Sequence, residues 1–184
     1  MNKNLIAHMV AGVLLLGTSV ASMAATNTVG SHQQTLGLSV TSGTCNVTWP
    51  TDVSFSVNSA DTSVSNGAKV GDTQEAGSFI LTGCPAKTLM KFAVQASNIA
   101  QGNIWQGMFT DTSGKAVTNI GYRLSATENF TVPWKLNGTE GNLGTTDENG
   151  DLTVPVYAGL VKRGSSTVNP GELSSVITYT ISYD

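Results

Sequence analysis

The sequence predicts an all-β sandwich, and three observations support this fold class. Apolar and polar residues alternate in short segments, turn-forming residues separate these segments, and no helical period follows the first 24 residues. Alternation places the apolar side chains of each strand on one face, as the core of a sandwich requires. Charge is sparse: nine Lys and Arg and twelve Asp and Glu residues give a net charge of −3. This balance excludes nucleic-acid binding as the expected function.

The expected strands follow one another along the chain. They are residues 35–40, 52–58, 79–81, 90–96, 120–124, 132–136, 152–156 and 177–183. Pairs such as Asn66-Gly67 and Asn149-Gly150 lie between them and mark turns, because Asn and Gly tolerate a positive φ. The polar tract 139–150 is predicted to be a long hairpin loop.

The N-terminus, residues 1–24, is predicted to be a secretory signal peptide. Lys3 precedes an apolar stretch, and the small residues around Ser22 and Ala24 suit a signal peptidase, with cleavage after Ala24 or Ala25. The apolar stretch is shorter than a transmembrane helix requires. A buried N-terminal helix is the alternative, but the segment has no charged face. The mature chain is then expected to consist of an N-terminal arm, residues 25–34, and one domain, residues 35–184.

The mature chain contains two cysteines, Cys45 and Cys84. An even count in an exported chain predicts one disulfide, which closes a loop of about 40 residues and contributes roughly 4 kcal/mol in the chain-entropy account. Two free thiols or half of a metal site are the alternatives. The metal site is disfavoured because His32 is the only histidine of the mature chain and the sequence contains no Cys-x-x-Cys motif.

The C-terminal strand and the N-terminal arm are the most distinctive segments. On the strand, hydroxylated residues alternate with four apolar ones, which are Ile177, Tyr179, Ile181 and Tyr183. Because this strand runs to the last residues, we expect its hydrophobic edge to be uncovered and to invite pairing with another chain. The arm is polar; its clear apolar side chain is Val29, and Gly30, Ser31 and Gln33 follow. It is interpreted either as a disordered terminus or as a strand kept free for a neighbour.

Several features together carry a family resemblance. Cys45 lies about twenty residues into the mature chain, Cys84 closes a predicted strand, Gly171 lies fourteen residues from the end, and Tyr183 is penultimate. With the signal peptide and the arm, this set resembles the pilin subunits of the chaperone–usher pathway, of the type 1 fimbrial kind. The resemblance covers the whole chain.

The resemblance implies an incomplete immunoglobulin-like sandwich that lacks its last strand. A donor strand from a periplasmic pilus chaperone, and later from a neighbouring pilin subunit at the outer-membrane usher, would complete it. Repeating this step builds a head-to-tail fibre, a fimbrium on the cell surface. The implied donor residues are Val29, Gly30, Ser31 and Gln33. The implied groove residues are Gly171, Ile177, Tyr179, Ile181, Tyr183 and Asp184, whose terminal carboxylate would be held by basic residues of the chaperone.

The expected function is therefore that of a structural subunit of an adhesive fimbria, contributing to bacterial cell adhesion. Donor arms of this family usually alternate apolar residues, whereas the arm here is weakly apolar. This departure leaves a minor, adaptor or base-proximal subunit as an alternative, or a single-domain adhesin that binds a host glycan or protein. Trp105, flanked by loop residues, is the candidate ligand-binding aromatic residue. Trp134 is expected in the core and Trp49 near the disulfide, and at this length we do not expect a two-domain tip adhesin.

No enzyme activity and no cofactor are expected. With a single mature histidine in a polar arm, a Ser-His-Asp triad is implausible. Three acidic residues, Asp147, Glu148 and Asp151, could be considered for calcium, but the full ligand spacing is absent. We therefore interpret them as a solvated acidic loop.

Overall fold

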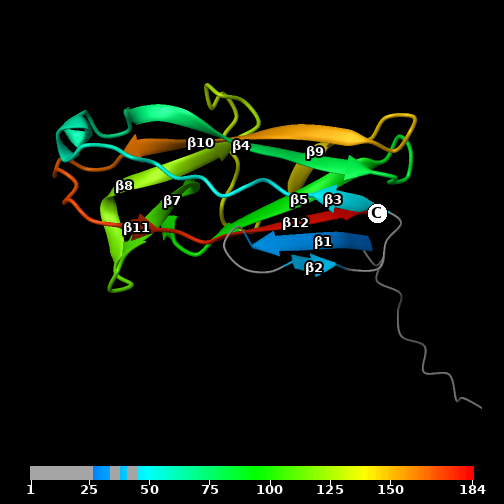
Figure 1. The fold of residues 1–184 in the computed structure, drawn as a ribbon, viewed down its shortest axis with the longest axis horizontal. Helices are drawn as coiled ribbons and strands as arrows, with labels where there is room; N and C mark the ends of the chain where they lie inside the picture. Colours follow the sequence, from blue (N-terminus) through cyan, green and yellow to red (C-terminus); the bar gives the residue numbers. More distant parts are fainter. Residues whose placement is uncertain (1–26, 34–37, 41–44) are drawn as a thin grey trace, which may run out of the picture.

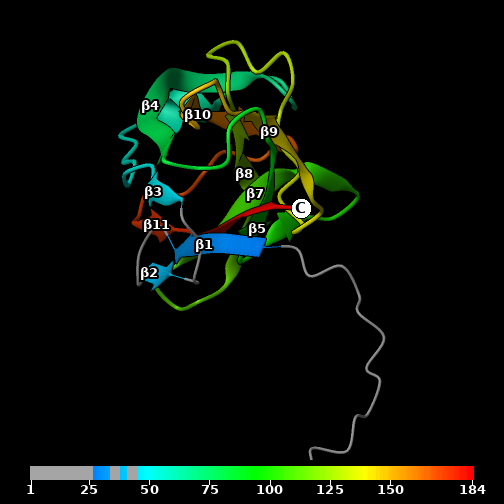
Figure 2. The same cartoon turned by 90° about the vertical axis from the view of Figure 1, so that its right-hand side faces the viewer.

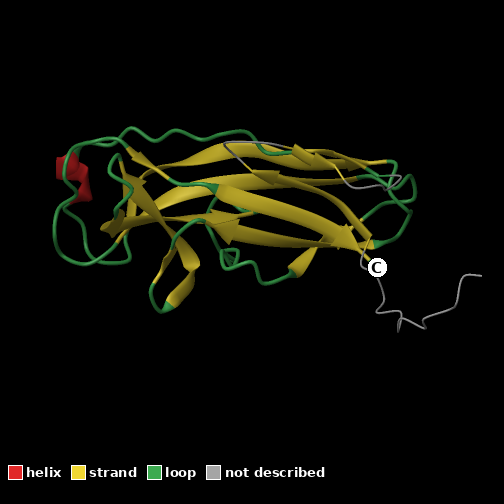
Figure 3. Ribbon diagram, turned by 90° about the horizontal axis from the view of Figure 1, so that it is seen from below, coloured by secondary structure: helices red, strands yellow, loops and turns green. Residues whose placement is uncertain are grey.

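The computed structural model describes residues 27–33, 38–40 and 45–184. They form two antiparallel β-sheets that are stacked face to face (Figures 1 and 2). Within this part of the chain, helical structure is limited to one 3-10 turn, η1 (Ser59–Thr62), as Figure 3 shows. The predicted all-β fold is confirmed. None of the described residues belongs to a helix long and apolar enough to cross a membrane.

The first sheet has five strands in the order β2-β1-β12-β5-β9. Every neighbouring pair is antiparallel. The strand bounds, in sheet order, are Leu38–Val40, Asn27–Gln33, Ile177–Tyr183, Leu89–Ala96 and Gly141–Thr145. The C-terminal strand β12 is therefore at the centre of this sheet.

The second sheet has the strand order β11-β7-β8-β10-β4-β3, and the short strand β6 (Ile99–Ala100) pairs with β7. The bounds in sheet order are Leu173–Ser174, Asn103–Asp111, Ala116–Ser125, Leu152–Lys162, Lys69–Thr82 and Asn46–Thr48. Because β11 belongs to this sheet and β12 to the other, the chain crosses between sheets at residues 175–176.

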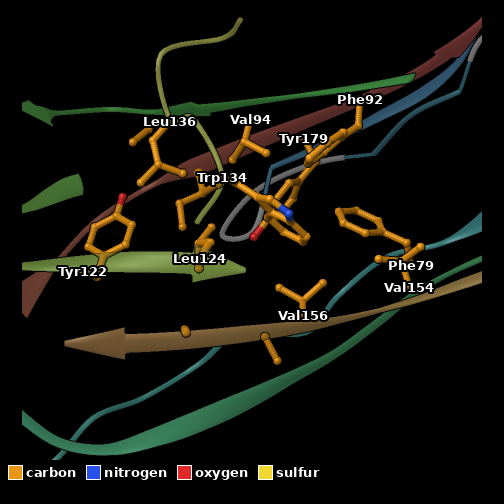
Figure 4. Close-up of a cluster of buried hydrophobic side chains, with 14 of the residues drawn as sticks. Phe79, Phe92, Val94, Tyr122, Leu124, Trp134, Leu136, Val154, Val156 and Tyr179 are labelled. Atoms are coloured by element: carbon orange, nitrogen blue, oxygen red, sulfur yellow. The ribbon is translucent and has the colours of Figure 1, made fainter. Parts of the chain in front are cut away.

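Aromatic side chains from both sheets meet in the core (Figure 4). Tyr179 of β12 packs edge-on against Phe79 of β4, with ring centroids 5.1 Å apart. Trp134 lies 5.0 Å from Phe92 and 6.0 Å from Phe79. Trp134 is buried, as expected, and Trp49 packs at 6.0 Å against Phe79. Edge-to-face pairs of this kind add about 0.5–1.5 kcal/mol each beyond the area that they bury.

The predicted disulfide is present between Cys45 and Cys84. It joins the residue before β3 to the loop after β4, next to the paired residues Asn46 and Thr82. The Cys84 N–H donates to the Gly150 carbonyl at 3.1 Å, and a Cβ at position 150 would lie 1.9 Å from the Cys84 carbonyl oxygen. Only glycine therefore fits at position 150, where φ is also positive.

Two expected strands are wrong, and their predicted apolar faces are buried only in part, because Val57 and Val132 are exposed. Residues 52–58 form an extended segment rather than a strand, yet Val53 and Phe55 pack against the core. Residues 132–136 form only an isolated bridge at Pro133, while Trp134 and Leu136 are buried. Alternation predicts which face is buried, but it does not guarantee a backbone partner, and Pro133 has no N–H to donate.

Other differences concern strand content. The tract 139–150 is not one long loop, because it contains β9. Strands β3 and β7 were not expected, and β4 extends ten residues upstream of Phe79. Of the expected strand 35–40, β2 covers 38–40, while residues 34–37 and the signal peptide 1–24 lie outside the described residues.

Candidate functional site: the groove along the C-terminal strand

The C-terminal strand β12 presents its apolar face to the core. Ile177, Tyr179 and Ile181 are buried, and Tyr179 has no exposed surface. Tyr183 is half-buried and packs against the core cluster. The alternation in the sequence thus correctly predicts the inward face of this strand. The roles of these residues in binding a partner's strand remain predictions.

The N-terminal arm lies along β12 of its own chain. β1 pairs with β12 in antiparallel register, from Asn27 opposite Tyr183 to Gln33 opposite Thr178. A register shift between Thr28 and Gly30 marks a bulge. We expected an uncovered edge, but β12 has β1 on one side and β5 on the other. Backbone groups make such a ladder whatever the side chains are, so a polar arm can complete it.

Strand β2 folds back on the outer edge of β1. His32 pairs with Leu38, Ser31 with Ser39 and Gly30 with Val40. The outer strand of the sheet at this side is therefore only three residues long. A short edge strand limits further pairing with other chains.

Beyond the end of β1, the residues that lead into β11 line a cavity of about 590 Å³. One wall is the extended segment 53–57, and the other is the segment 168–174 that leads into β11. Side chains at its floor and rim include Phe55, Val57, Phe109, Leu160 and Leu173. We call residues 178–183 of β12 the covered half of the groove and this cavity the open half.

The wall of the open half that precedes β11 is held by hydrogen bonds to η1. Ser59 Oγ donates to the Val168 carbonyl at 2.6 Å, and the Val168 N–H donates to Thr62 Oγ1 at 3.1 Å. Gly171 lines the cavity with φ +153°, and an added Cβ there would meet nothing within 4 Å. Glycine at position 171 is thus favoured by the backbone conformation and not by lack of space.

Tyr122 connects the inner face of the second sheet to the junction between the two halves. Its hydroxyl lies 2.8 Å from Ser175 Oγ, and the Ser97 N–H donates to the adjacent Val176 carbonyl at 2.8 Å. Burial raises the pKa of Tyr122 to about 12, although the Ser175 hydrogen bond opposes this shift. Burial also raises the pKa of Tyr179. Both phenols are therefore neutral in the folded protein at neutral pH.

The end of β12 is tied to β5 by an exposed ion pair. Lys91 Nζ donates to the Asp184 carboxylate and lies 3.5 Å from Glu140 Oε1. The hydrogen bond to Asp184 is the main cause that raises the pKa of Lys91. Because these groups are solvent-accessible, the contact positions the strand end more than it stabilises the fold.

Trp105 lies in strand β7, so the expectation that it is carried by a loop is wrong. Its side chain is 43% exposed, while its neighbour Gln106 is buried and accepts a hydrogen bond from Arg163 Nη1 at 2.6 Å. Trp105 is not among the residues that line the open half of the groove. The candidate ligand aromatic and the groove are separate features.

The acidic residues of the 147–151 turn have local partners. Asp147 Oδ1 accepts from the N–H groups of Asn149 at 2.8 Å and Asp151 at 2.9 Å, and such backbone bonds lower its pKa. Glu148 pairs with Lys87 at 3.0 Å, and Asp151 accepts from the Gly83 N–H at 3.3 Å. Across the described ranges, no group of three or more His, Cys, Asp or Glu side chains could hold a metal ion.

Sequence reasoning missed the open half of the groove. Its signal was present in Val53, Phe55 and Val57, which alternate in a segment without strand pairing, and in the Asn169-Pro170-Gly171 turn. Here the apolar alternation lies in a segment whose backbone makes no strand pairing, next to a turn. The cavity depends on how far apart the two walls lie, which a one-dimensional pattern does not specify.

Known proteins resemble this chain in structure and not in sequence. No family model and no curated protein matches it. A subunit in a chaperone–usher pilus structure has a TM-score of 0.56 at 14% identity, over 95% of this chain and 100% of that one. The P pilus rod subunit PapA has a TM-score of 0.57 at 14% identity, over 82% and 97%. The CupB6 tip adhesin from Pseudomonas aeruginosa has a TM-score of 0.40 at 18% identity, over 66% and 34%.

The first two similarities extend over nearly the whole of each pilus subunit. Both TM-scores are above 0.5, so the similarity concerns the overall fold. The chain has the fold of chaperone–usher pilus subunits.

Proposed function

We propose that this protein is a structural subunit of an adhesive fimbria, polymerised by donor-strand exchange and contributing to bacterial cell adhesion. One observation carries the proposal: the strand position beside β12 is filled by an N-terminal segment that precedes the domain. The same antiparallel ladder can be made by the corresponding segment of a neighbouring subunit. The fold shared with pilus subunits supports this interpretation.

Exchange of the arm between subunits explains assembly in physical terms. The arm of one copy would pair with β12 of the next copy, whose own arm remains available for a third. Such a contact does not close on itself and therefore generates a fibre. Backbone hydrogen bonds set the register, and each apolar side chain that is covered contributes roughly 1.5–3 kcal/mol.

Before assembly, a periplasmic chaperone would hold the same strand position, and an outer-membrane usher would catalyse the exchange. This route requires export, which the signal peptide predicted at residues 1–24 would provide. The contact residues proposed on the acceptor side are Ile177, Tyr179, Ile181, Tyr183 and Asp184, with Gly171 at the far end. Those on the donor side are Val29, Gly30, Ser31 and Gln33.

Removal of the arm tests the proposal. A chain without residues 25–34 can accept a strand but cannot donate one, so we expect it to terminate fibres. Electron microscopy and gel filtration of mixtures with the intact chain should show fibres that shorten as the deleted chain increases. Fibres of unchanged length, with the deleted chain excluded or incorporated throughout, would contradict donor-strand exchange.

The chaperone step has its own test. Tyr183→Ser should lower the yield of the one-to-one complex with the cognate chaperone, because Tyr183 packs at the end of β12. Tyr157→Ser, a half-buried tyrosine of β10 in the other sheet, is the matched control. Equal complex yields for the two variants would remove Tyr183 from the proposed contact.

A second candidate function is that of an adaptor subunit or single-domain adhesin. The observation that favours it is the exposed Trp105 on β7, because exposed aromatic rings bind the faces of sugars. Binding to a glycan array that is lost in Trp105→Ala and retained in Val132→Ala, a second exposed apolar site, would support this role. An array without signal would contradict the adhesin role and leave the structural role as the one proposed function.

A further inference from the structure

We propose that the second sheet carries a binding site on its outer face, the face that points away from the first sheet. There Arg123 and Arg163 bind the carboxylate of an acidic saccharide, and the Phe130 ring covers the apolar face of the sugar. These are the two arginines of the chain. The site involves neither β12 nor the arm, so it goes beyond the structural role proposed above.

Strand register places Arg123 on the outer face. On β8, Tyr122 is buried in the core (Figure 4), so the pleat turns the next residue, Arg123, to the opposite side. The partner of Arg123 on β10 is Gly159. On β7, Gln106 takes the position next to the paired residues Gly107 and Tyr122, and it therefore lies beside Arg123 on the same face.

Arg163 reaches the same place from the end of β10. Its Nη1 donates to Gln106 Oε1 at 2.6 Å, and a Cβ at position 121 would lie 3.2 Å from its Cδ. Gly121 shares the outer face with Arg123, because the two are two residues apart on β8. The missing side chain at Gly121 leaves the space over which Arg163 extends. The two arginines thus flank the buried side chain of Gln106.

The two guanidinium groups have no acidic partner. Among the described residues, ion pairs are made by Lys87 and Lys91 and by neither arginine. Within the same part of the chain, the Arg123 side chain makes no hydrogen bond, and Nε of Arg163 is buried without a hydrogen-bond partner. A buried donor without a partner calls for an explanation, and a carboxylate fits the planar donor array of arginine. A bound carboxylate would also offset the repulsion between the two cations.

Phe130 supplies an apolar surface next to Arg123. Its ring lies over Gly159, where an added Cβ would come within 2.7 Å of two ring atoms. Because Gly159 is the β10 partner of Arg123, the ring and the guanidinium occupy neighbouring positions on the outer face. Phe130 has a φ of +53°, a conformation that is costly for an aromatic residue and that often accompanies a functional site. The side chain is half-buried, so part of the ring is accessible to a ligand.

The loop that carries Phe130 also borders a hollow of about 430 Å³. The hollow is lined by this loop and by the first residue of β4, through Lys69, Thr127, Glu128, Asn129 and Thr131. Hydroxyl and amide groups can pair with sugar hydroxyls, an aromatic ring can cover the apolar face of a pyranose, and arginines bind a carboxylate. This combination favours an acidic saccharide over an acidic peptide, whose carboxylates would use the arginines alone.

Calorimetric titration of the full-length mature chain with defined saccharides tests the proposal. The probes are sialyllactose and a hyaluronan tetrasaccharide, which carry carboxylates on different sugar acids, and lactose, which carries none. We expect acidic saccharides to bind about tenfold or more tightly than lactose. Arg123→Gln removes a charge that has no partner among the described residues, and it should weaken this binding about tenfold. Lys115→Gln removes the same charge at the exposed turn between β7 and β8 and should leave the affinity nearly unchanged.

Phe130→Gly provides a second variant, because glycine accepts the positive φ while the ring is lost. We expect a several-fold weaker affinity and an unchanged thermal unfolding transition. Equal affinities for lactose and the acidic saccharides, or no binding of any probe, would overturn the proposal. So would equal effects of Arg123→Gln and Lys115→Gln, or binding of a polyglutamate peptide in place of the saccharides. A loss in Trp105→Ala without a loss in Arg123→Gln would assign the sugar to Trp105 and overturn the arginine site.

Discussion

The two halves of the groove differ in how they are completed. In the covered half, β12 has a hydrogen-bonded strand on each side, and Tyr179 and Ile181 have no exposed surface. In the open half, the chain has crossed to the other sheet as β11, and the facing segment 52–58 makes no strand. A cavity of about 590 Å³ remains between these walls.

If strands are exchanged as proposed, the difference indicates that the incoming strand has two separate roles. The covered half already has its large side chains, since Tyr179 packs on Phe79 across the sandwich, and what β1 adds there is mainly a backbone partner for β12. The open half lacks side chains that fill space. A polar strand suffices for the first task, whereas the second requires aliphatic residues. The predictions below measure these two contributions separately.

The largest effect is expected where the covered half is most densely packed. Tyr179→Ala removes a fully buried ring and its edge-on contact with Phe79, so we expect a loss of about 3–5 kcal/mol in the free energy of unfolding. Thr180→Ala, the adjacent residue on the opposite face of β12, should cost less than about 1 kcal/mol. Urea unfolding of both variants checks this contrast, and similar losses would show that the covered half has no densely packed inner face.

The backbone contribution of the arm is expected to come next. Ser31→Pro removes an N–H in the middle of β1, a strand paired on both sides, and should destabilise the self-closed monomer by about 3 kcal/mol. Asn27→Pro, at the first residue of the strand, is the control and should be tolerated far better. Guanidinium unfolding measures both changes. If Ser31→Pro is neutral, β1 does not hold β12 through its backbone.

The sequence predicted burial better than it predicted pairing. The alternation of Ile177, Tyr179 and Ile181 correctly indicated an inward face, because the period of a strand is geometric. The same reasoning at Phe55 and Leu136 identified core contacts but wrongly assigned strands. Alternation indicates which face of a segment is shielded from solvent. Which strand forms its hydrogen bonds depends on the surrounding fold.

The remaining errors also concern which strands pair with one another. β7 was missed because its buried positions do not alternate with polar ones: Gln106 and Gly107 are adjacent and both buried. The pairing of the arm with its own β12 depends on the tertiary position of β12, which the polar composition of the arm does not indicate. The disulfide was predictable because only two cysteines were available.

A pH effect is expected at the junction between the two halves. Burial raises the pKa of Tyr122 to about 12, whereas the phenol of an unfolded chain titrates near 10. The neutral phenol is therefore fully compatible with folding below pH 10, and stability is lost as the pH rises from 10 to 12. Over this window, Tyr122 contributes about 2–3 kcal/mol of alkaline destabilisation.

Tyr122→Phe should remove that part of the loss in unfolding free energy at alkaline pH. Urea unfolding at several pH values between 8 and 12 measures this change. Ser175→Ala is the control, because it removes the 2.8 Å hydrogen bond and keeps the ionisable phenol. The control should retain the steep alkaline decline. If Tyr122→Phe and Ser175→Ala give the same pH profile, ionisation of the Tyr122 phenol is not the cause of the alkaline loss of stability.

The smallest effect is expected in the open half, and it should depend on assembly. Leu173 is half-buried on the wall of an unfilled cavity, so Leu173→Ala should cost the monomer only about 1 kcal/mol in urea unfolding. In fibres formed by the proposed strand exchange, a neighbour's strand would cover this wall, and the same substitution should then accelerate fibre dissociation by a larger factor than the monomer loss predicts. Leu89→Ala, an exposed leucine of β5, serves as the control in both states. Equal effects of Leu173→Ala in monomer and fibre would mean that the open half stays open after assembly, and the distinction between the two halves would then have no part in polymerisation.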